Sequence, residues 1–113
     1  FGNARWLINL DISNWNTSGL VRADAAFIQC AALTNLAPGS WDIINLISAD
    51  SAFNGMQAWE NQYYSALLIS WGAQTVQPSV PLGANFTKYS TSAVAGRDAL
   101  VTAGWNITDA GPE

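Results

Sequence analysis

The chain repeats part of itself with a constant 26-residue period, and this period limits its possible folds more than any other feature. Residues 6–28, WLINLDISNWNTSGLVRADAAFI, align without a gap on residues 32–54, ALTNLAPGSWDIINLISADSAFN. Identical residues at equivalent positions are Leu7 and Leu33, Asn9 and Asn35, Leu10 and Leu36, Trp15 and Trp41, Leu20 and Leu46, Ala23 and Ala49, Asp24 and Asp50, Ala26 and Ala52, and Phe27 and Phe53. Phe1 lies one further period before Phe27. A short repeat cannot bury its apolar face alone, so equivalent segments are expected to stack on one another.

A period in the twenties that carries LxxL is typical of a leucine-rich solenoid with short parallel strands. We therefore predict an α/β fold in which residues 1–55 form about two 26-residue coils. The leucines of each LxxL segment should face the core beside a strand. Pro38 cannot donate to a sheet ladder, so the second strand is expected to be weakened or at an edge.

Residues 56–113 lose the repeat and are predicted to form a helical C-terminal cap in the same domain. Apolar spacing of three and four predicts a helix over 56–71, closed by Gly72. A second helix is predicted over 92–103, with Thr91 or Ser92 as its N-cap and Gly104 past its end. The segment between the helices contains Pro78 and Pro81 and is expected to be loop with short extended pieces. A final strand is predicted in WNITDAG.

The pattern LDISNWNTSGL, followed by F, C and LTNL, closely resembles the BspA-like leucine-rich repeat family of bacterial surface proteins, whose repeats also occur in phage structural proteins. The first copy carries the resemblance through Leu10, Asp11, Ser13, Asn14, Trp15, Asn16, Thr17, Ser18, Phe27, Cys30, Leu33 and Leu36. The second copy is degenerate, and the second half resembles the ending YxxLLxxW…GWxITDxG of many such chains. The resemblance implies a solenoid, adhesion and protein recognition, and a chain that belongs to a longer array.

Composition argues against several function classes. Only 11% of residues are charged and the net charge is −4, with Arg5, Arg22, Lys88 and Arg97 scattered singly. Such a chain lacks the basic patch that nucleic acid requires, and its apolar runs are too short for membrane insertion. Histidine is absent, so no Ser–His or Cys–His pair can form, and we expect no enzyme, no catalytic residue, no cofactor and no metal site. Cys30, in an apolar setting, is expected to be buried and inert.

The candidate binding surface is centred on the repeated tryptophans and their polar neighbours: Trp15, Trp41, Asn14, Asn16 and Asp42. Outward-facing indoles would form a stripe for sugar or protein, whereas inward-facing ones would be core; we favour an inward or half-buried orientation. The Asn and Ser side chains around Trp15 are expected to bond backbone groups at the turn. Three further tryptophans, Trp59, Trp71 and Trp105, are predicted to be packing residues.

Several charged residues leave alternatives open. Asp24 and Asp50 should lie on adjacent coils as a solvated ladder or as backbone caps, with bridging of Ca²⁺ as the other possibility. Arg97 could pair with Asp98 or Asp109, or remain solvated.

Two functions follow as hypotheses. The first is a non-enzymatic structural or binding module, a surface adhesin or a virion fibre or capsid-decoration protein, that contacts protein partners or a host surface. The second is a carbohydrate-binding module that binds a host-surface glycan through exposed tryptophans. The expected partners also include further copies in a homo-oligomer or neighbouring repeats of a longer chain, and the expected location is extracellular, on a cell surface or in a virion.

Overall fold

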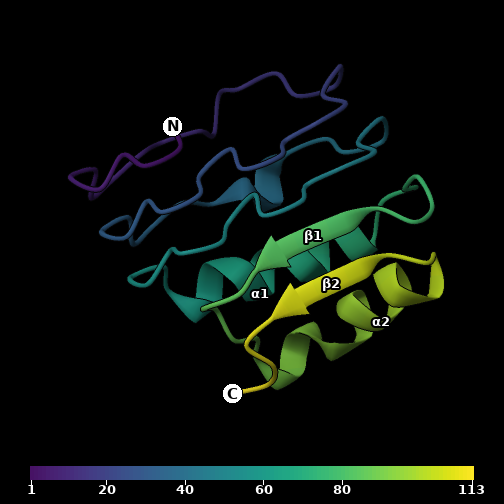
Figure 1. Cartoon of the computed structure of the whole chain (residues 1–113). Helices are drawn as coiled ribbons and strands as arrows, with labels where there is room; N and C mark the ends of the chain where they lie inside the picture. The colour runs from purple at the N-terminus through teal and green to yellow at the C-terminus, as the bar shows by residue number, and fades with distance from the viewer.

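The computed structural model describes residues 1–113 and has an α/β architecture with two helices and one two-stranded parallel sheet (Figure 1). The elements are α1 (Asn61–Gly72), β1 (Pro81–Ala84), α2 (Val94–Thr102) and β2 (Asn106–Asp109), with 3₁₀ turns at Pro38–Ser40 and Thr91–Ala93. Residues before α1 form irregular segments that lie side by side and continue onto β1 and then β2 (Figure 1). The α/β class predicted from the sequence is thereby confirmed.

Backbone hydrogen bonds join equivalent positions of the repeat. The Thr34 amide donates to the Ile8 carbonyl at 3.1 Å, and the Glu60 amide donates to the Thr34 carbonyl at 3.1 Å. Each of these bonds spans one full repeat period, so the structural repetition continues to Glu60, past Phe53, the last residue that is identical between the two repeats.

Left-handed backbone also recurs with the repeat. Ala25 and Ser51 have φ of 53° and 56°. Asn3, Gln29 and Gly55 have φ of 65°, 61° and 75°. Each left-handed residue turns the chain out of the extended conformation, because strands require negative φ. The stacked segments are therefore chains of tight turns.

The strands expected in the repeats are not formed, which corrects that part of the prediction. Between residues 1 and 60 the parallel pairing is reduced to isolated bridges, such as Arg22 with Ser48. Pro38 opens a 3₁₀ turn and occupies its first position, where a missing N–H costs nothing. The second LxxL segment is consequently followed by a turn and not by an edge strand.

The regular sheet lies in the segment predicted as the cap. Strands β1 and β2 pair in parallel, with Leu82 opposite Ile107. A bridge between Ala49 and Leu82 connects β1 to the second repeat, so the sheet extends the stack of repeats. The final strand predicted in WNITDAG is confirmed as β2.

Both predicted helices are present with shifted ends. α1 begins at Asn61, later than the predicted start at residue 56, because residues 56–60 still follow the repeat. α2 lies inside the predicted range, and Gly104 follows it with φ of 90°. The predicted N-cap is wrong: no side chain caps α2, and the Ser92 hydroxyl instead lies 2.7 Å from that of Ser90.

One hydrophobic cluster of 25 buried residues connects the repeats to the helical half. Cys30 is fully buried within it, as expected, and its thiol donates to the Phe1 carbonyl at 3.0 Å. Trp59, Trp71 and Trp105 are buried packing residues, which confirms that prediction. Neither α1 nor α2 has the length and hydrophobicity of a membrane-spanning helix.

Candidate functional site: an aromatic groove on the first repeat

The repeated aromatic residues form two columns that run through the stack. Phe1, Phe27 and Phe53 follow one another with ring centroids 5.8 and 6.0 Å apart and interplanar angles of 5° and 6°. Trp15 stacks on Trp41 at 6.2 Å and 15°. Separations of this size are those of favourable offset-stacked rings. The columns result directly from the 26-residue spacing of the sequence.

Exposure rises steeply at the outer end of each column. Phe53 and Phe27 are 0% and 1% exposed, whereas Phe1 is 60% exposed. Trp41 is 3% exposed and Trp15 is 42% exposed. The inward orientation favoured from the sequence thus holds for Trp41, while Trp15 is half-buried and presents one side to solvent.

The exposed ends of the two columns enclose a groove of about 260 Å³, here called the aromatic groove. Its wall includes the rings of Phe1, Trp15, Phe27 and Trp41 together with Thr17 and Arg22. An apolar concavity with a few polar groups is the usual form of a binding site. Other apolar side chains of the first repeat and the residues before it are also exposed, namely Trp6, Ile8 and Val21.

The buried indole of Trp41 has no hydrogen-bond partner. Its Nε1 is buried and unpaired, although Trp41 lines the aromatic groove. The other buried tryptophans donate to backbone carbonyls: Trp59 to Leu36, Trp71 to Pro38 and Trp105 to Gln77, at 2.8, 3.0 and 2.8 Å. A buried N–H without an acceptor costs free energy, and Trp41 alone among the buried tryptophans bears this cost.

The polar residues predicted around the tryptophans serve local turns. Asn16 Oδ1 accepts from the Ser18 amide at 3.2 Å, and Asp42 Oδ1 accepts from the Ile44 amide at 3.1 Å. Asn14 is exposed and makes no side-chain hydrogen bond within the chain. The structure therefore unites Trp15 and Trp41 in the groove wall but leaves Asn14, Asn16 and Asp42 outside it. The expectation that Asn and Ser bond backbone at this turn is confirmed for Asn16.

Asp24 caps the neighbouring repeat. Its Oδ1 accepts from the Ser48 hydroxyl and from the Asp50 amide, the latter at 3.2 Å, and its Oδ2 lies 3.0 Å from Arg22 Nη1. The hydrogen bond from Ser48 is the main cause that lowers the pKa of Asp24 below its ordinary value. Of the roles that the sequence left open for Asp24, the structure shows that of a backbone cap, because its carboxylate accepts from the Asp50 amide. No group of three or more His, Cys, Asp or Glu side chains gathers in a way that could hold a metal ion.

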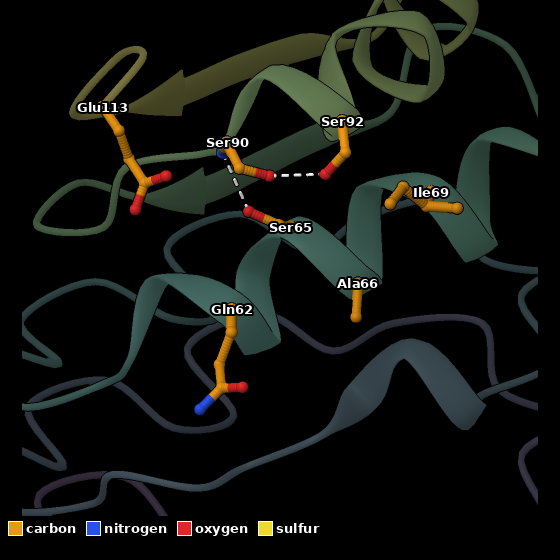
Figure 2. Close-up of a pocket in the computed structure, with 7 residues that line it drawn as sticks. All are labelled: Gln62, Ser65, Ala66, Ile69, Ser90, Ser92 and Glu113. Atoms are coloured by element: carbon orange, nitrogen blue, oxygen red, sulfur yellow. Dashed lines mark hydrogen bonds between the residues drawn. The ribbon is translucent and has the colours of Figure 1, made fainter.

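A second hollow lies between α1 and the segment that leads into α2 (Figure 2). It holds about 270 Å³, and five of its seven lining residues are polar, including Ser65, Ser90, Ser92 and Glu113. The Ser90 amide donates to Ser65 Oγ at 2.9 Å, and Glu113 accepts from Asn61 Nδ2 at 3.1 Å. Sequence reasoning missed this hollow because Ser65 is remote from the other two serines in the chain and the three follow no motif. No hydrogen bond joins Glu113 to a serine of this hollow.

A polar cluster joins α1, α2 and β2 outside both hollows. Asp109 Oδ2 accepts from the Tyr64 hydroxyl at 2.6 Å and from Arg97 Nε at 2.9 Å. Of the alternatives left open, Arg97 therefore pairs with Asp109. Burial, followed by the hydrogen bond to Asp109, raises the pKa of Tyr64 well above its ordinary value. Because the three side chains are paired with one another, the cluster serves to hold the fold together.

Comparisons with protein-family models, with curated proteins and with solved structures find no match to this chain.

Proposed function

We propose that the chain is a non-enzymatic structural and binding module that contacts protein through the aromatic groove of its first repeat. The observation that carries this proposal is the contrast in exposure along the ring columns: Phe27 is 1% exposed and Phe1 is 60% exposed. An exposed, contiguous apolar patch of this kind usually marks an interaction surface. Aromatic side chains are also enriched at protein interfaces.

The proposed architecture is a leucine-rich-repeat-like solenoid of about two coils with a helical cap. Its support is the recurrence, at the period of the repeat, of hydrogen bonds, left-handed residues and stacked rings. As part of the same proposal, the module acts outside the cell, on a cell surface or in a virion. That setting rests on the resemblance to BspA-like proteins and on the low fraction of charged residues.

A carbohydrate-binding module is the second candidate, and the position of Trp15 is what favours it. The indole is 42% exposed and lies in a groove that also contains Arg22 and Thr17. A ring face beside hydrogen-bonding groups is an arrangement that a sugar could use. Against this, the Thr17 hydroxyl already accepts from the Asp42 amide at 2.8 Å and donates to the Asp42 carbonyl at 3.2 Å.

Photo-crosslinking in the native setting separates the two candidates. A photoreactive phenylalanine analogue is placed at position 15, or at position 101 as a control, since Val101 is 47% exposed on α2 at the far end of the fold. The full protein is irradiated on the producing cells or particles and its adducts are identified by mass spectrometry. Polypeptide adducts from position 15 that are absent from position 101 support protein binding. Glycan adducts at position 15 support the carbohydrate alternative, and equal adducts at both positions contradict a role for the groove.

A further inference from the structure

The hollow between α1 and the segment that leads into α2 is built on one face of the helix. Four of its lining residues lie three or four positions apart on α1, namely Gln62, Ser65, Ala66 and Ile69. Residues with this spacing share one side of a helix. Ser90 and Ser92 lie across the hollow from α1, and Glu113 completes the wall (Figure 2). We call this site the serine hollow.

Hydrogen bonds hold the segments of this wall together without a ligand. The Ser90 amide donates to Ser65 Oγ at 2.9 Å, which joins the upper segment to α1. The Glu113 amide donates to the Tyr89 carbonyl at 2.9 Å, and Asn61 Nδ2 donates to Glu113 Oε2 at 3.1 Å. A wall that is already arranged lowers the entropy cost of binding.

The serine hollow contains hydroxyl hydrogens that no atom of the chain accepts. Ser65 is 5% exposed, and its Oγ accepts the Ser90 amide but donates to no group of the chain. The hydroxyl oxygens of Ser90 and Ser92 lie 2.7 Å apart. One of these two hydroxyls donates to the other, so the hydrogen of the accepting serine is left over. Two O–H donors are therefore available to a ligand.

The same wall also offers acceptors. Gln62 Nε2 donates to Glu60 Oε1 at 2.7 Å, and Gln62 Oε1 accepts no hydrogen bond. Glu113 Oε2 accepts from Asn61, whereas Glu113 Oε1 accepts from no group of the chain. A ligand that fits this wall must therefore both accept and donate hydrogen bonds.

Size and the apolar part of the wall restrict the ligand further. Ala66 and Ile69 are the two hydrophobic residues of the lining, and Ile69 is 46% exposed. The volume of about 270 Å³ lies just below the range of about 300–1,000 Å³ that is usual for drug-sized ligands. The hollow thus suits one small ring that carries hydroxyls on its edge and C–H groups on its face.

We propose that the serine hollow binds a neutral polyhydroxylated ring, the chemistry of a single sugar unit. Its hydroxyls accept from the serine hydroxyls and donate to Gln62 Oε1 and Glu113 Oε1, and its C–H face packs on Ile69. The serine hollow shares no lining residue with the aromatic groove. The site therefore goes beyond the proposed function and does not depend on it.

Other small ligands match the wall less well. An anion would meet the carboxylate of Glu113 in a chain of net charge −4. An ammonium group only donates hydrogen bonds, so it would leave the two serine donors without acceptors. No group of three His, Cys, Asp or Glu side chains is present to hold a metal ion.

Nuclear magnetic resonance titration of the ¹⁵N-labelled protein tests the site. The probes are glucose, galactose, mannose and N-acetylglucosamine at millimolar concentrations. We expect at least one of them to shift the amide signals of Ser90, Ser92 and Glu113 in a saturable way. Ser92→Ala removes a hydroxyl from an exposed residue and should weaken this binding about three- to tenfold. Thr102→Ala is the matched control, because it removes an exposed hydroxyl at the far end of α2 and should leave binding unchanged.

The methyl glycoside of the sugar that binds distinguishes two sources of the same chemistry. Equal affinity for the glycoside supports a site for the terminal unit of a glycan, and loss of affinity supports a site for the free monosaccharide. The proposal is overturned if none of the four sugars shifts these amides, or if Ser92→Ala and Thr102→Ala bind equally well. It is also overturned if only inorganic phosphate or ethanolamine shifts them, or if the sugar shifts are confined to the aromatic groove. Crosslinking from position 15 reports on the other site, so the two proposals fail separately.

Discussion

The carboxylate of Asp109 lies between Tyr64 and Arg97, 2.6 Å from the hydroxyl of the former and 2.9 Å from Nε of the latter. Its side chain is only 2% exposed, and its Oδ1 also accepts from the Gly111 amide at 3.0 Å. One buried carboxylate therefore connects α1, α2 and the end of β2. A buried acceptor with several donors is stable only while all of them are present.

Replacing Asp109 with alanine should destabilise the protein by about 3 kcal/mol, because it leaves Arg97 and Tyr64 without their shared acceptor. Chemical denaturation measures this change. Asp98→Ala is the matched control, since Asp98 is exposed and forms no ion pair, and it should change stability by less than about 0.5 kcal/mol. If Asp109→Ala does not fold, Tyr64→Phe removes one donor and should cost about 1 kcal/mol. Similar stabilities for the Asp98 and Asp109 variants would contradict the structural role of the cluster.

Acid should weaken the contact that Asp24 makes with the second repeat. Its pKa is lowered in the folded protein from 3.8, mainly by the Ser48 hydroxyl, so folding favours the ionised carboxylate. That contribution is present above the ordinary pKa and is lost as the pH falls below it. The difference in urea midpoint between the wild type and Asp24→Ala should therefore be present at pH 7 and shrink as the pH falls below about 3.8. A difference that is independent of pH would show that Asp24 contributes only as a neutral group.

The two helices cross where Gly72 meets Gly96. A Cβ on Gly72 would lie 2.7 Å from the Gly96 Cα, and a Cβ on Gly96 would lie 3.0 Å from the Ile69 Cα with backbone of Leu68 closer still. Gly96→Ala should thus destabilise the protein by about 1–3 kcal/mol through overpacking, even though alanine favours helix. Gly19→Ala is the control, because nothing lies within 4 Å of a Cβ at that position. Thermal unfolding of both variants tests this close crossing: the unfolding midpoint should fall for Gly96→Ala and stay unchanged for Gly19→Ala.

Ala25 has a left-handed backbone with φ of 53°, which an alanine adopts at a cost of about 1–2 kcal/mol. Ala25→Gly should relieve this cost and offset the entropy that glycine loses on folding, which is about 0.5–1 kcal/mol. Ala26→Gly has no such gain, because Ala26 is not left-handed. We expect Ala25→Gly to be the more stable variant by about 1 kcal/mol in denaturant titrations. The reverse order would argue against the turn at Ala25.

Much of the local structure could be predicted from residues close together in the chain. The repeat predicted that equivalent segments stack, and this stacking accounts for the ring columns, because equal spacing in sequence places Phe1, Phe27 and Phe53 at equivalent positions of successive segments. Apolar periodicity located both helices to within a few residues, since a helix is made by contacts three and four residues apart. The burial of Cys30 followed from its apolar neighbours.

Other features depend on partners far apart in the sequence, and only the tertiary structure decided them. The repeats form turns and not strands because left-handed residues such as Ala25 and Gln29 are stabilised by hydrogen bonds to the neighbouring segment, which composition does not reveal. Trp15 and Trp41 are identical residues at equivalent positions, yet one is half-exposed and the other buried. Their difference in exposure arises from what covers each repeat: the Trp15 ring covers Trp41, whereas the outer side of Trp15 faces solvent. The sequence by itself thus determined which residues stack, and the stack determined which of them remain free to bind.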